Sequence, residues 1–238
     1  MTDEPYRWLE AVSNRREYIR DQLKGATPVF AFSRPEGVLL LGLGTGQSKV
    51  FEIYDRHALA ALGHPVDIEK IRQTVIEAAH LEGFTRAAED VTLRRLINAS
   101  LGPLLKASFE QIFAAPLMVE AILAEVGTTP SQDVLARVGY DGAQRFVATG
   151  IAVAHTAPAD EKAATEWLTA TLTAESSLAD VVRRAVQASH QLSSGKPFAV
   201  PGDEAGPPLD GKVVELALLD RRLAGRVRYR PLDAAKLS

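Results

Sequence analysis

Two patterns of hydrophobic residues meet between residues 49 and 81, and the other elements of the chain are expected to pack on this stretch. Before His64 the apolar residues follow no helical spacing, which favours two short strands at 49–54 and 57–62. After Pro65 the spacing becomes that of an amphipathic helix. The apolar stripe of this helix consists of Ile68, Ile71, Val75, Ile76 and Ala79. The stretch therefore predicts a strand pair that leads directly into a helix.

An N-terminal helix is predicted over residues 3–24, ahead of the first strand. Pro5 after two acidic residues is typical of a first helical turn, and Gly25 marks the end of the helix. The apolar stripe has a polar gap at Arg15 and Arg16. Its members are Trp8, Val12, Ile19 and Leu23. A surface helix of the same domain and a helix packed between neighbouring subunits both fit this stripe.

Strands and helices follow one another in groups along the rest of the chain. Two apolar runs joined by an Arg-Pro-Glu-Gly link predict a hairpin, and the second run is apolar on both faces, so both should be buried. Pro103 should kink or divide a long helix near Leu101 and Gly102. The predicted ranges are strands at 29–33, 38–43, 118–126, 133–140, 145–149, 213–219 and 226–230, helices at 90–113, 161–173 and 177–191, and a loop at 193–211.

The order of these elements indicates the fold class. Strands and helices do not alternate one by one, which argues against a doubly wound parallel sheet. Grouped strands with paired helices favour two sheets packed face to face, with a helix layer on each outer side. We therefore expect an α+β fold in four layers, an α/β/β/α sandwich, with an additional N-terminal helix.

Composition narrows the class of protein further. A net charge of -3 and a pI near 6.0 provide no general basic field for nucleic acid. No apolar run approaches the roughly 20 residues that a bilayer span needs, and the acidic N-terminus does not resemble a secretory signal. The chain has no cysteine, which excludes disulfides, thiolate zinc sites and cysteine catalysis. We expect a cytoplasmic protein that binds neither nucleic acid nor membrane.

A glycine-rich segment at residues 42–49 is expected to form a flexible surface turn, but it also invites a nucleotide-binding interpretation. It lacks the Walker pattern around Lys49, and the last glycine of the dinucleotide pattern is replaced by Gln47. A strand follows it, rather than a helix whose N-terminus could hold a phosphate. The pattern therefore disfavours nucleotide binding.

The histidines do not indicate a metal site or a cofactor. None has metal-ligand spacing to another histidine or to a carboxylate on one face of an element. They are His57, His64, His80, His155 and His190. We expect neither a bound metal nor a cofactor.

Three short motifs carry a resemblance to a known family. They are EIYDRHALAALGH, EGFTRAAEDVT and VEAILAEVG, in that order and separated by predicted helices. Their order resembles that of the α subunit of the 20S proteasome, especially the actinobacterial kind, over roughly residues 15 to 232. The resemblance implies the four-layer fold of the N-terminal nucleophile (Ntn) hydrolases. The chain departs from the family motif YDRRDVTGR between residues 86 and 94, which puts the contacts between subunits in doubt there.

The resemblance also implies a function and partners. Alpha-type subunits form a non-catalytic outer ring of own copies, seven in the family, which docks on a ring of β subunits and gates substrate entry. A lysine before the YDR corner, here Lys49, would receive the C-terminal carboxylate of an ATPase or cap activator, with Gly46 and Gln47 at the rim of that pocket. Residues 1–25 would serve gating and assembly, and residues 26–238 would form the proteasome-like domain. The assembly residues would be Tyr54, Asp55, Arg56 and Asp90, although Asp55 and Arg56 also fit a simple ion pair at a strand turn.

The alternative is an enzyme, a self-processing Ntn hydrolase or β-type protease subunit. Such a chain would use an N-terminal threonine whose free amine acts as its base, and Thr27 is nearest to that place. The expected acid is missing, because Leu43 and Gly44 stand at the end of the second strand. The supporting lysine also lacks a match, unless Lys49 takes its place. The sequence therefore favours a non-catalytic chain.

Overall fold

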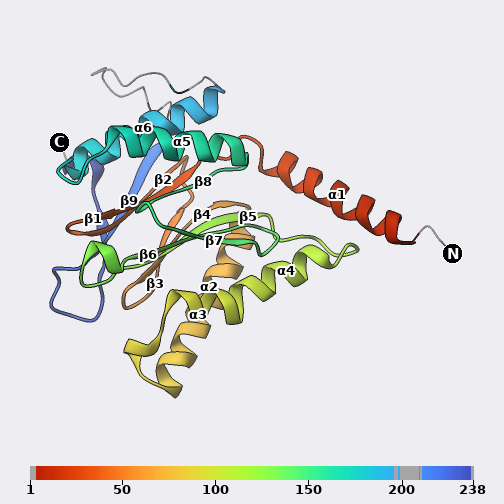
Figure 1. Cartoon of the computed structure of the whole chain (residues 1–238), viewed down its shortest axis with the longest axis horizontal. Coiled ribbons are helices and arrows are strands. Elements are labelled where there is room, and N and C mark those ends of the chain that lie inside the picture. The colour runs from red at the N-terminus through yellow and green to blue at the C-terminus, as the bar shows by residue number, and fades with distance from the viewer. Residues whose placement is uncertain (1–3, 196–197, 199–208, 210, 237–238) are drawn as a thin grey trace.

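The computed structural model describes residues 4–195, 198, 209 and 211–236. It contains two antiparallel five-stranded sheets packed face to face (Figure 1). The first sheet has the order β10-β9-β2-β1-β8, and the second has the order β3-β4-β5-β6-β7. The first sheet consists of β1 (Val29–Arg34), β2 (Gly37–Gly44), β8 (Ile151–Ala154), β9 (Val213–Asp220) and β10 (Tyr229–Leu232). The second consists of β3 (Val50–Tyr54), β4 (His57–Gly63), β5 (Val119–Glu125), β6 (Val134–Val138) and β7 (Gln144–Val147).

Helices cover the outer face of each sheet, and a further helix leaves the body at one end (Figure 1). Two helices, α5 (Pro158–Thr171) and α6 (Leu178–Ser194), lie on the first sheet. The second sheet is covered by α2 (Pro65–Thr85), α3 (Leu93–Leu96) and α4 (Gly102–Glu110), and the N-terminal helix is α1 (Glu4–Leu23). Three buried apolar clusters fill the interfaces: one between the sheets and one between each sheet and its helices. The α/β/β/α prediction is confirmed.

The helix after β4 has the face that its sequence predicts. Ile68, Ile71, Val75 and Ala79 are buried against the second sheet, because a spacing of three or four residues puts them on one side of α2. The long helix is divided where the sequence predicted, since a π-helical segment (Ile97–Leu101) separates α3 from α4. Pro103 has no N–H to donate to the preceding turn, so the regular helical ladder is interrupted there.

Some boundaries differ from the prediction, and one strand was missed. Gly42 and Gly44 belong to β2 and pair with β9, so only the residues after Gly44 form the surface turn. Strand β8 was not predicted, because its four residues follow β7 too closely to stand out as a separate apolar run. It carries the chain from the second sheet to the first, where it pairs with β1. Most of the predicted loop at 193–211 lies outside the described residues.

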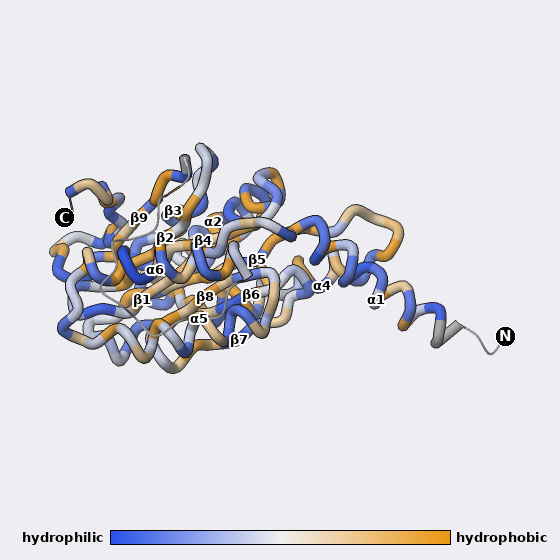
Figure 2. Tube along the Cα trace, turned by 90° about the horizontal axis from the view of Figure 1, so that it is seen from above, coloured by the Kyte–Doolittle hydropathy of each residue, from blue (hydrophilic) through white to orange (hydrophobic). Residues whose placement is uncertain are grey.

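One end of the sandwich brings together the start of β1, the end of β2 and the start of β3, and we name it the α1 end. The register places the start of β1 beside the ends of β2 and β8, and the end of β4 beside the start of β5. Helix α1 leaves from this end (Figures 1 and 2). The β3–β4 corner lies at the opposite end. Among the described residues, no helix is long and apolar enough to cross a membrane.

Candidate functional site at the α1 end

Lys49 connects the two sheets at the α1 end. It directly precedes β3 of the second sheet, yet its ammonium group reaches Thr27, which lies just before β1 of the first sheet. The Nζ atom donates to the Thr27 carbonyl oxygen at 2.9 Å and also to the Thr27 hydroxyl oxygen. The backbone N–H of Lys49 donates to Glu215 Oε2 of β9 at 2.5 Å. Main chain and side chain are therefore both held by the first sheet.

Two glycines of β2 make room for the lysine side chain. A Cβ atom at Gly42 would lie 2.9 Å from Lys49 Cβ and 3.3 Å from Lys49 Cδ, and one at Gly44 would lie 3.7 Å from Lys49 Cε. Separations below about 3 Å are not tolerated between carbon atoms, so Gly42 leaves space that a larger residue would fill. The side chain of Lys49 thus packs on the two glycines of β2. The local sequence pattern did not indicate this packing.

The environment of Lys49 lowers its proton affinity. Burial lowers the pKa of the Lys49 ammonium to about 8, and the positive charge of Lys212 contributes in the same direction. The carboxylate of Glu215 opposes both by favouring the charged form. Lys49 is therefore still mainly protonated at neutral pH, but it loses its charge in a range where a solvated lysine would keep it.

Thr27 is buried, and its hydroxyl has a partner that cannot act as a base. The hydroxyl donates to the carbonyl oxygen of Leu43, while it accepts from Lys49. The backbone nitrogen of Thr27 lies in a peptide bond with Ala26, downstream of α1. The sequence left Lys49 as the one candidate for the supporting lysine, and the structure places its ammonium group on Thr27. The expected acid at the end of β2 has no counterpart at Leu43 or Gly44.

The turn between β2 and β3 borders this site. Gly46 and Gln47 are exposed, and Gly46 has a φ angle of 124°, a left-handed conformation that favours glycine. Together with Ser48, β9 and β10 they line a cavity of about 530 Å³. Tyr229 closes one side of it and donates from its hydroxyl to the carbonyl oxygen of Val50 at 3.3 Å. Gly46 and Gln47 thus line a cavity at the same end of the sandwich as Lys49, which is not among its lining residues, and their role at the rim of a docking pocket stays a prediction.

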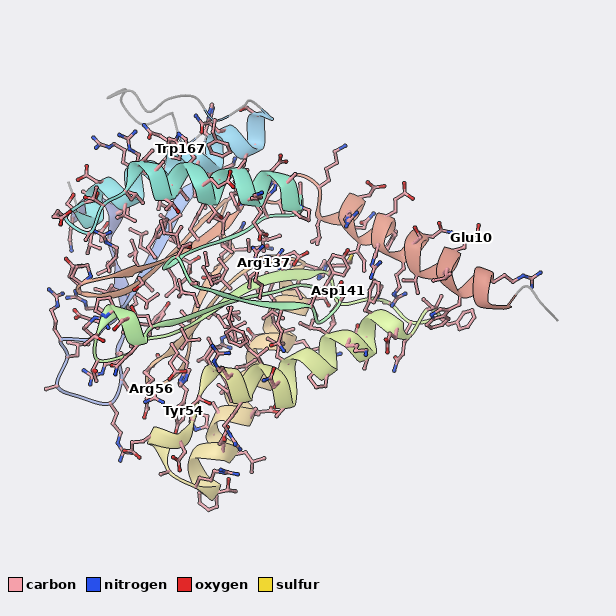
Figure 3. All side chains as sticks on the ribbon, viewed as in Figure 1. Glu10, Tyr54, Arg56, Arg137, Asp141 and Trp167 are labelled. Carbon is pink, nitrogen blue, oxygen red and sulfur yellow. The ribbon has the colours of Figure 1, made fainter. Side chains whose placement is uncertain are left out.

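The YDR corner lies at the end of the sandwich opposite to the α1 end, where Figure 3 labels Tyr54 and Arg56. Arg56 does not pair with Asp55; it forms an ion pair with Glu125 at 3.1 Å and donates to the carbonyl oxygens of Glu89 and Val91. The Asp55 carbonyl accepts from the backbone N–H of Arg228 at 2.7 Å. The ion-pair interpretation of the corner is therefore wrong, and Arg56 instead holds the segment that follows α2.

Tyr54 and Asp90 differ in how far they are engaged within the chain. The Tyr54 ring packs edge-on against His80 with 5.1 Å between ring centres, and its hydroxyl lies over Gly83. Asp90 is exposed in a short 3-10 turn (Ala88–Asp90). His57 is buried, with its Nε2 atom 3.5 Å from Glu125 Oε2. The structure thus gathers Tyr54, Arg56 and the turn at 88–90 around the same end of α2.

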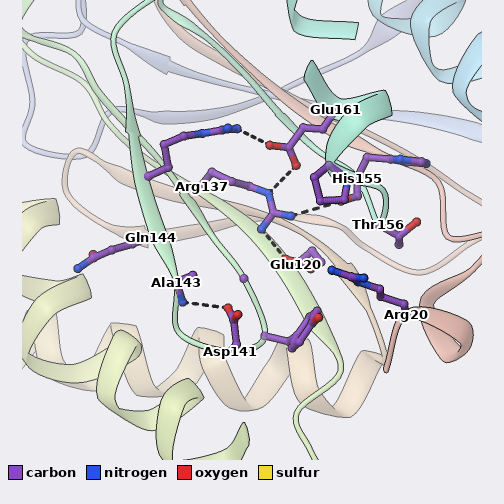
Figure 4. Close-up of a pocket in the computed structure, with 13 residues that line it drawn as sticks. Arg20, Glu120, Arg137, Asp141, Ala143, Gln144, His155, Thr156 and Glu161 are labelled. Atoms are coloured by element: carbon purple, nitrogen blue, oxygen red, sulfur yellow. Dashed lines mark hydrogen bonds and ion pairs between the residues drawn. The ribbon is translucent and has the colours of Figure 1, made fainter. Parts of the chain in front are cut away.

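A second cavity at the α1 end holds a buried ionic network that the sequence did not indicate (Figure 4). Arg137 of β6 donates to Glu120 of β5 and, at 3.0 Å, to Glu161 of α5. Arg145 of β7 pairs with the other oxygen of Glu161. The network joins strands of the second sheet to a helix on the first, and Arg20 of α1 extends into the same cavity of about 240 Å³.

Burial changes the proton affinity of the acid at the centre of this network. It raises the pKa of the Glu120 carboxyl to about 7, although the positive charge of Arg137 opposes this shift. Glu161 and Asp141 raise it further by charge repulsion. The pKa of His155, at the end of β8, is lowered by burial. Each member is distant in sequence from the others, so no local motif could reveal the cluster.

Comparison with known proteins identifies the family. A proteasome subunit α of Renibacterium salmoninarum is 32% identical over 221 residues, which cover 89% of this chain and 82% of that protein. One of Streptomyces scabiei is 28% identical over 94% of this chain and 90% of that protein. One of Actinosynnema mirum is 37% identical over 56% of this chain and 51% of that protein. No family model matches the chain. With the four-layer fold and the motifs in their expected order, the chain belongs to the family of actinobacterial-type proteasome α subunits.

Proposed function

We propose that the chain is a non-catalytic subunit of the outer ring of a bacterial 20S proteasome. Its own copies form the ring, seven of them by resemblance, and the ring docks on β subunits and gates substrate entry. Residues 1–25 act as the gating and assembly segment, and residues 26–238 act as the proteasome-like domain. We place this complex in the cytoplasm, and the net charge of -3 supports neither nucleic acid nor an anionic membrane as its partner.

The state of Thr27 is the observation that carries the non-catalytic role. An N-terminal nucleophile needs a free α-amine as its base, whereas the nitrogen of Thr27 lies within the chain. Removing the segment before it would also remove Ile19 and Leu23, which are buried against the body. The hydroxyl proton of Thr27 points to a carbonyl oxygen, which cannot accept it in catalysis.

Lys49 supports a role in docking activators. Its ammonium group lies at the α1 end, beside an exposed rim at Gly46 and Gln47, and it is tied down by Thr27 and Glu215 rather than free to move. A pre-positioned cation costs less ordering entropy when it binds a carboxylate. The C-terminal carboxylate of an ATPase or cap activator would bind there, as a point-charge partner of the lysine.

The opposite end of the sandwich supports a role in assembly. Arg56 holds the turn after α2 through its hydrogen bonds, Tyr54 packs against α2 itself, and Asp90 stands exposed on that turn. Asp55 lies at the same corner. The residues at this corner would therefore fix the shape of the segment at 86–94. That segment, rather than every one of these residues, would then contact a neighbouring subunit.

A direct test is co-expression with a candidate β-type protease subunit, followed by negative-stain electron microscopy of the purified complex. The proposal expects cylinders with outer rings that contain this chain and peptidase activity that requires the β threonine. A complex in which the β threonine is replaced but activity persists would contradict the non-catalytic role.

The contact between Lys49 and Thr27 is the one observation that favours the alternative, a self-processing hydrolase. In that case the chain would be cleaved before Thr27, and the amine released would act as the base. Intact mass spectrometry decides between the two. A chain that keeps residues 3–26 after purification and long incubation excludes the hydrolase, whereas a chain that begins at Thr27 establishes it.

A further inference from the structure

Helix α1 rests on the body from Val12 to its C-terminal end, and the residues before Val12 project beyond it. Its buried stripe includes Arg15, Ile19 and Leu23, which lie on one face because they are four residues apart. Ile19 and Leu23 pack against Phe109 of α4 and against Tyr140. Arg15 is only 8% exposed, so the residue that appeared as a polar gap in the sequence is in fact part of the contact.

Arg15 binds the end of α4 with its terminal guanidinium nitrogens. Nη2 donates to the carbonyl oxygens of Ser108 and Ala114, both at 2.9 Å, and Nη1 donates to that of Ile112 at 3.2 Å. Ser108 lies in the last turn of α4, where carbonyls have no partners within the helix and the C-terminus carries partial negative charge, whereas Ile112 and Ala114 lie just beyond the helix end at Glu110. A planar guanidinium that binds three carbonyls at once also fixes direction, because its nitrogens form a rigid fork.

The same stripe continues beyond the body without cover. Trp8 lies seven residues before Arg15 on the same face and is 51% exposed, and its neighbour Leu9 is 65% exposed. The two views of the chain show this half of α1 extending into solvent (Figures 1 and 2), and Glu10 marks it in Figure 3. A helix half with exposed large apolar side chains is typical of a surface that a partner covers.

We propose that Arg15 is the positioning residue of ring assembly: it locks α1 at a fixed angle, so that Trp8 and Leu9 are presented to a second copy of this chain. This inference rests on the proposed function. A protruding helix that contacts a different surface of the next copy gives a head-to-tail interface, and such an interface closes into a ring only if its angle is constant. A hydrogen-bonded anchor at the base of α1 supplies that constancy before any copies meet.

Distance measurements test the lock separately from assembly. The chain has no cysteine, so a spin label can be placed at Glu10→Cys of α1 and another at Lys162→Cys of α5, both on exposed side chains. Dilution with unlabelled chain leaves only distances within one copy. Arg15→Met removes the fork at similar length, Arg15→Lys keeps the charge, and Arg7→Met is a control on the projecting half.

The lock predicts a narrow distance distribution in the parent chain and in Arg7→Met, and a broad one in Arg15→Met. The concentration for half-assembly, measured by native mass spectrometry, should rise about tenfold or more in Arg15→Met. Trp8→Ser should keep the narrow distribution and still lose assembly. If Arg15→Met does not fold, Arg15→Lys replaces it in the test. The distance distribution of Arg15→Lys should be wider than that of the parent chain and narrower than that of Arg15→Met.

Either of two results would overturn the inference: an unchanged distribution in a folded Arg15 variant, or normal ring formation despite a broad distribution. Failure of the proposed function looks different. In that case the parent chain forms no ring at any concentration, while the distance distributions still show whether Arg15 holds α1.

Discussion

The ammonium nitrogen of Lys49 lies 2.9 Å from the carbonyl oxygen of Thr27, although the two residues flank strands of different sheets. This contact explains two features together. It holds the lysine at the end of the sandwich from which α1 leaves, and it places the lysine against a threonine hydroxyl that in turn donates to the carbonyl oxygen of Leu43. The contact by itself therefore fits both the proposed docking site and the alternative, a self-processing hydrolase.

Lys49→Met should weaken binding of an activator tail to the assembled ring by about tenfold or more, because a charged partner of the carboxylate is lost. Fluorescence anisotropy with a labelled peptide that carries the C-terminal sequence of a candidate activator measures this. Lys70→Met, on the exposed side of α2, is the matched control and should bind as the parent does. Equal affinity of Lys49→Met and the parent would exclude the lysine from the site.

Thr27→Val separates positioning from charge. The substitution removes the hydroxyl contact of Lys49 but keeps the contact to the carbonyl oxygen, so tail affinity should fall less than in Lys49→Met. Titration of the same labelled peptide, with an amidated peptide that lacks the terminal charge for comparison, measures the difference. A loss of affinity as large in Thr27→Val as in Lys49→Met would contradict this order.

Tail binding should weaken as pH rises through about 8, where the Lys49 ammonium loses its proton. A bound carboxylate favours the charged form and shifts the midpoint upward, so titrations should extend to about pH 9.5. Lys49→Arg stays protonated over this range, and whatever affinity it retains should be independent of pH. Constant affinity in the parent chain across this range would show that the ammonium charge does not contribute.

Gly42→Ala should destabilise the fold by about 1–3 kcal/mol, because its methyl group would meet the Lys49 side chain at 2.9 Å. Urea unfolding monitored by circular dichroism measures the change. Gly225→Ala is the control, since a Cβ atom there meets no atom within 4 Å. Equal stability of the two variants would mean that Lys49 has another place to lie.

Glu120→Gln should flatten the pH dependence of stability between about 4.5 and 7. The pKa of Glu120 is raised from 4.5 to about 7 in the folded chain, so the native state binds more protons than the unfolded state in this window. Its contribution to stability is therefore present at low pH and is lost as pH rises through 7. Urea midpoints at several pH values measure the slope, and Glu166→Gln, an exposed carboxylate of α5, should leave it unchanged. If the urea midpoints of Glu120→Gln differed from those of the parent chain by the same amount at every pH, the raised pKa of Glu120 would not be the cause of the pH dependence.

Most of the fold could be predicted because its elements carry local periodicity. The stripe of α2 and the alternation of strand groups with helix pairs were sufficient for the four layers. Strand β8 escaped because four apolar residues after Gly150 carry no period of their own. Its place in the first sheet depends on pairing with β1, more than 100 residues earlier.

The candidate site could be predicted only in part. Lys49 was found through the resemblance, but its contact with Thr27 spans 22 residues and crosses between sheets. Arg15 interrupts the apolar stripe of α1, and from the local sequence an arginine at such a position is expected to be solvated. Its carbonyl partners lie in and just after α4, more than 90 residues away. The network around Arg137 likewise draws its members from separate elements.

The native mass of the purified chain, with and without a candidate β-type subunit, tests the central claim most directly. The account predicts a ring of identical copies, or a cylinder that forms only when the β subunit is present. A stable monomer that ignores every β chain offered would contradict it.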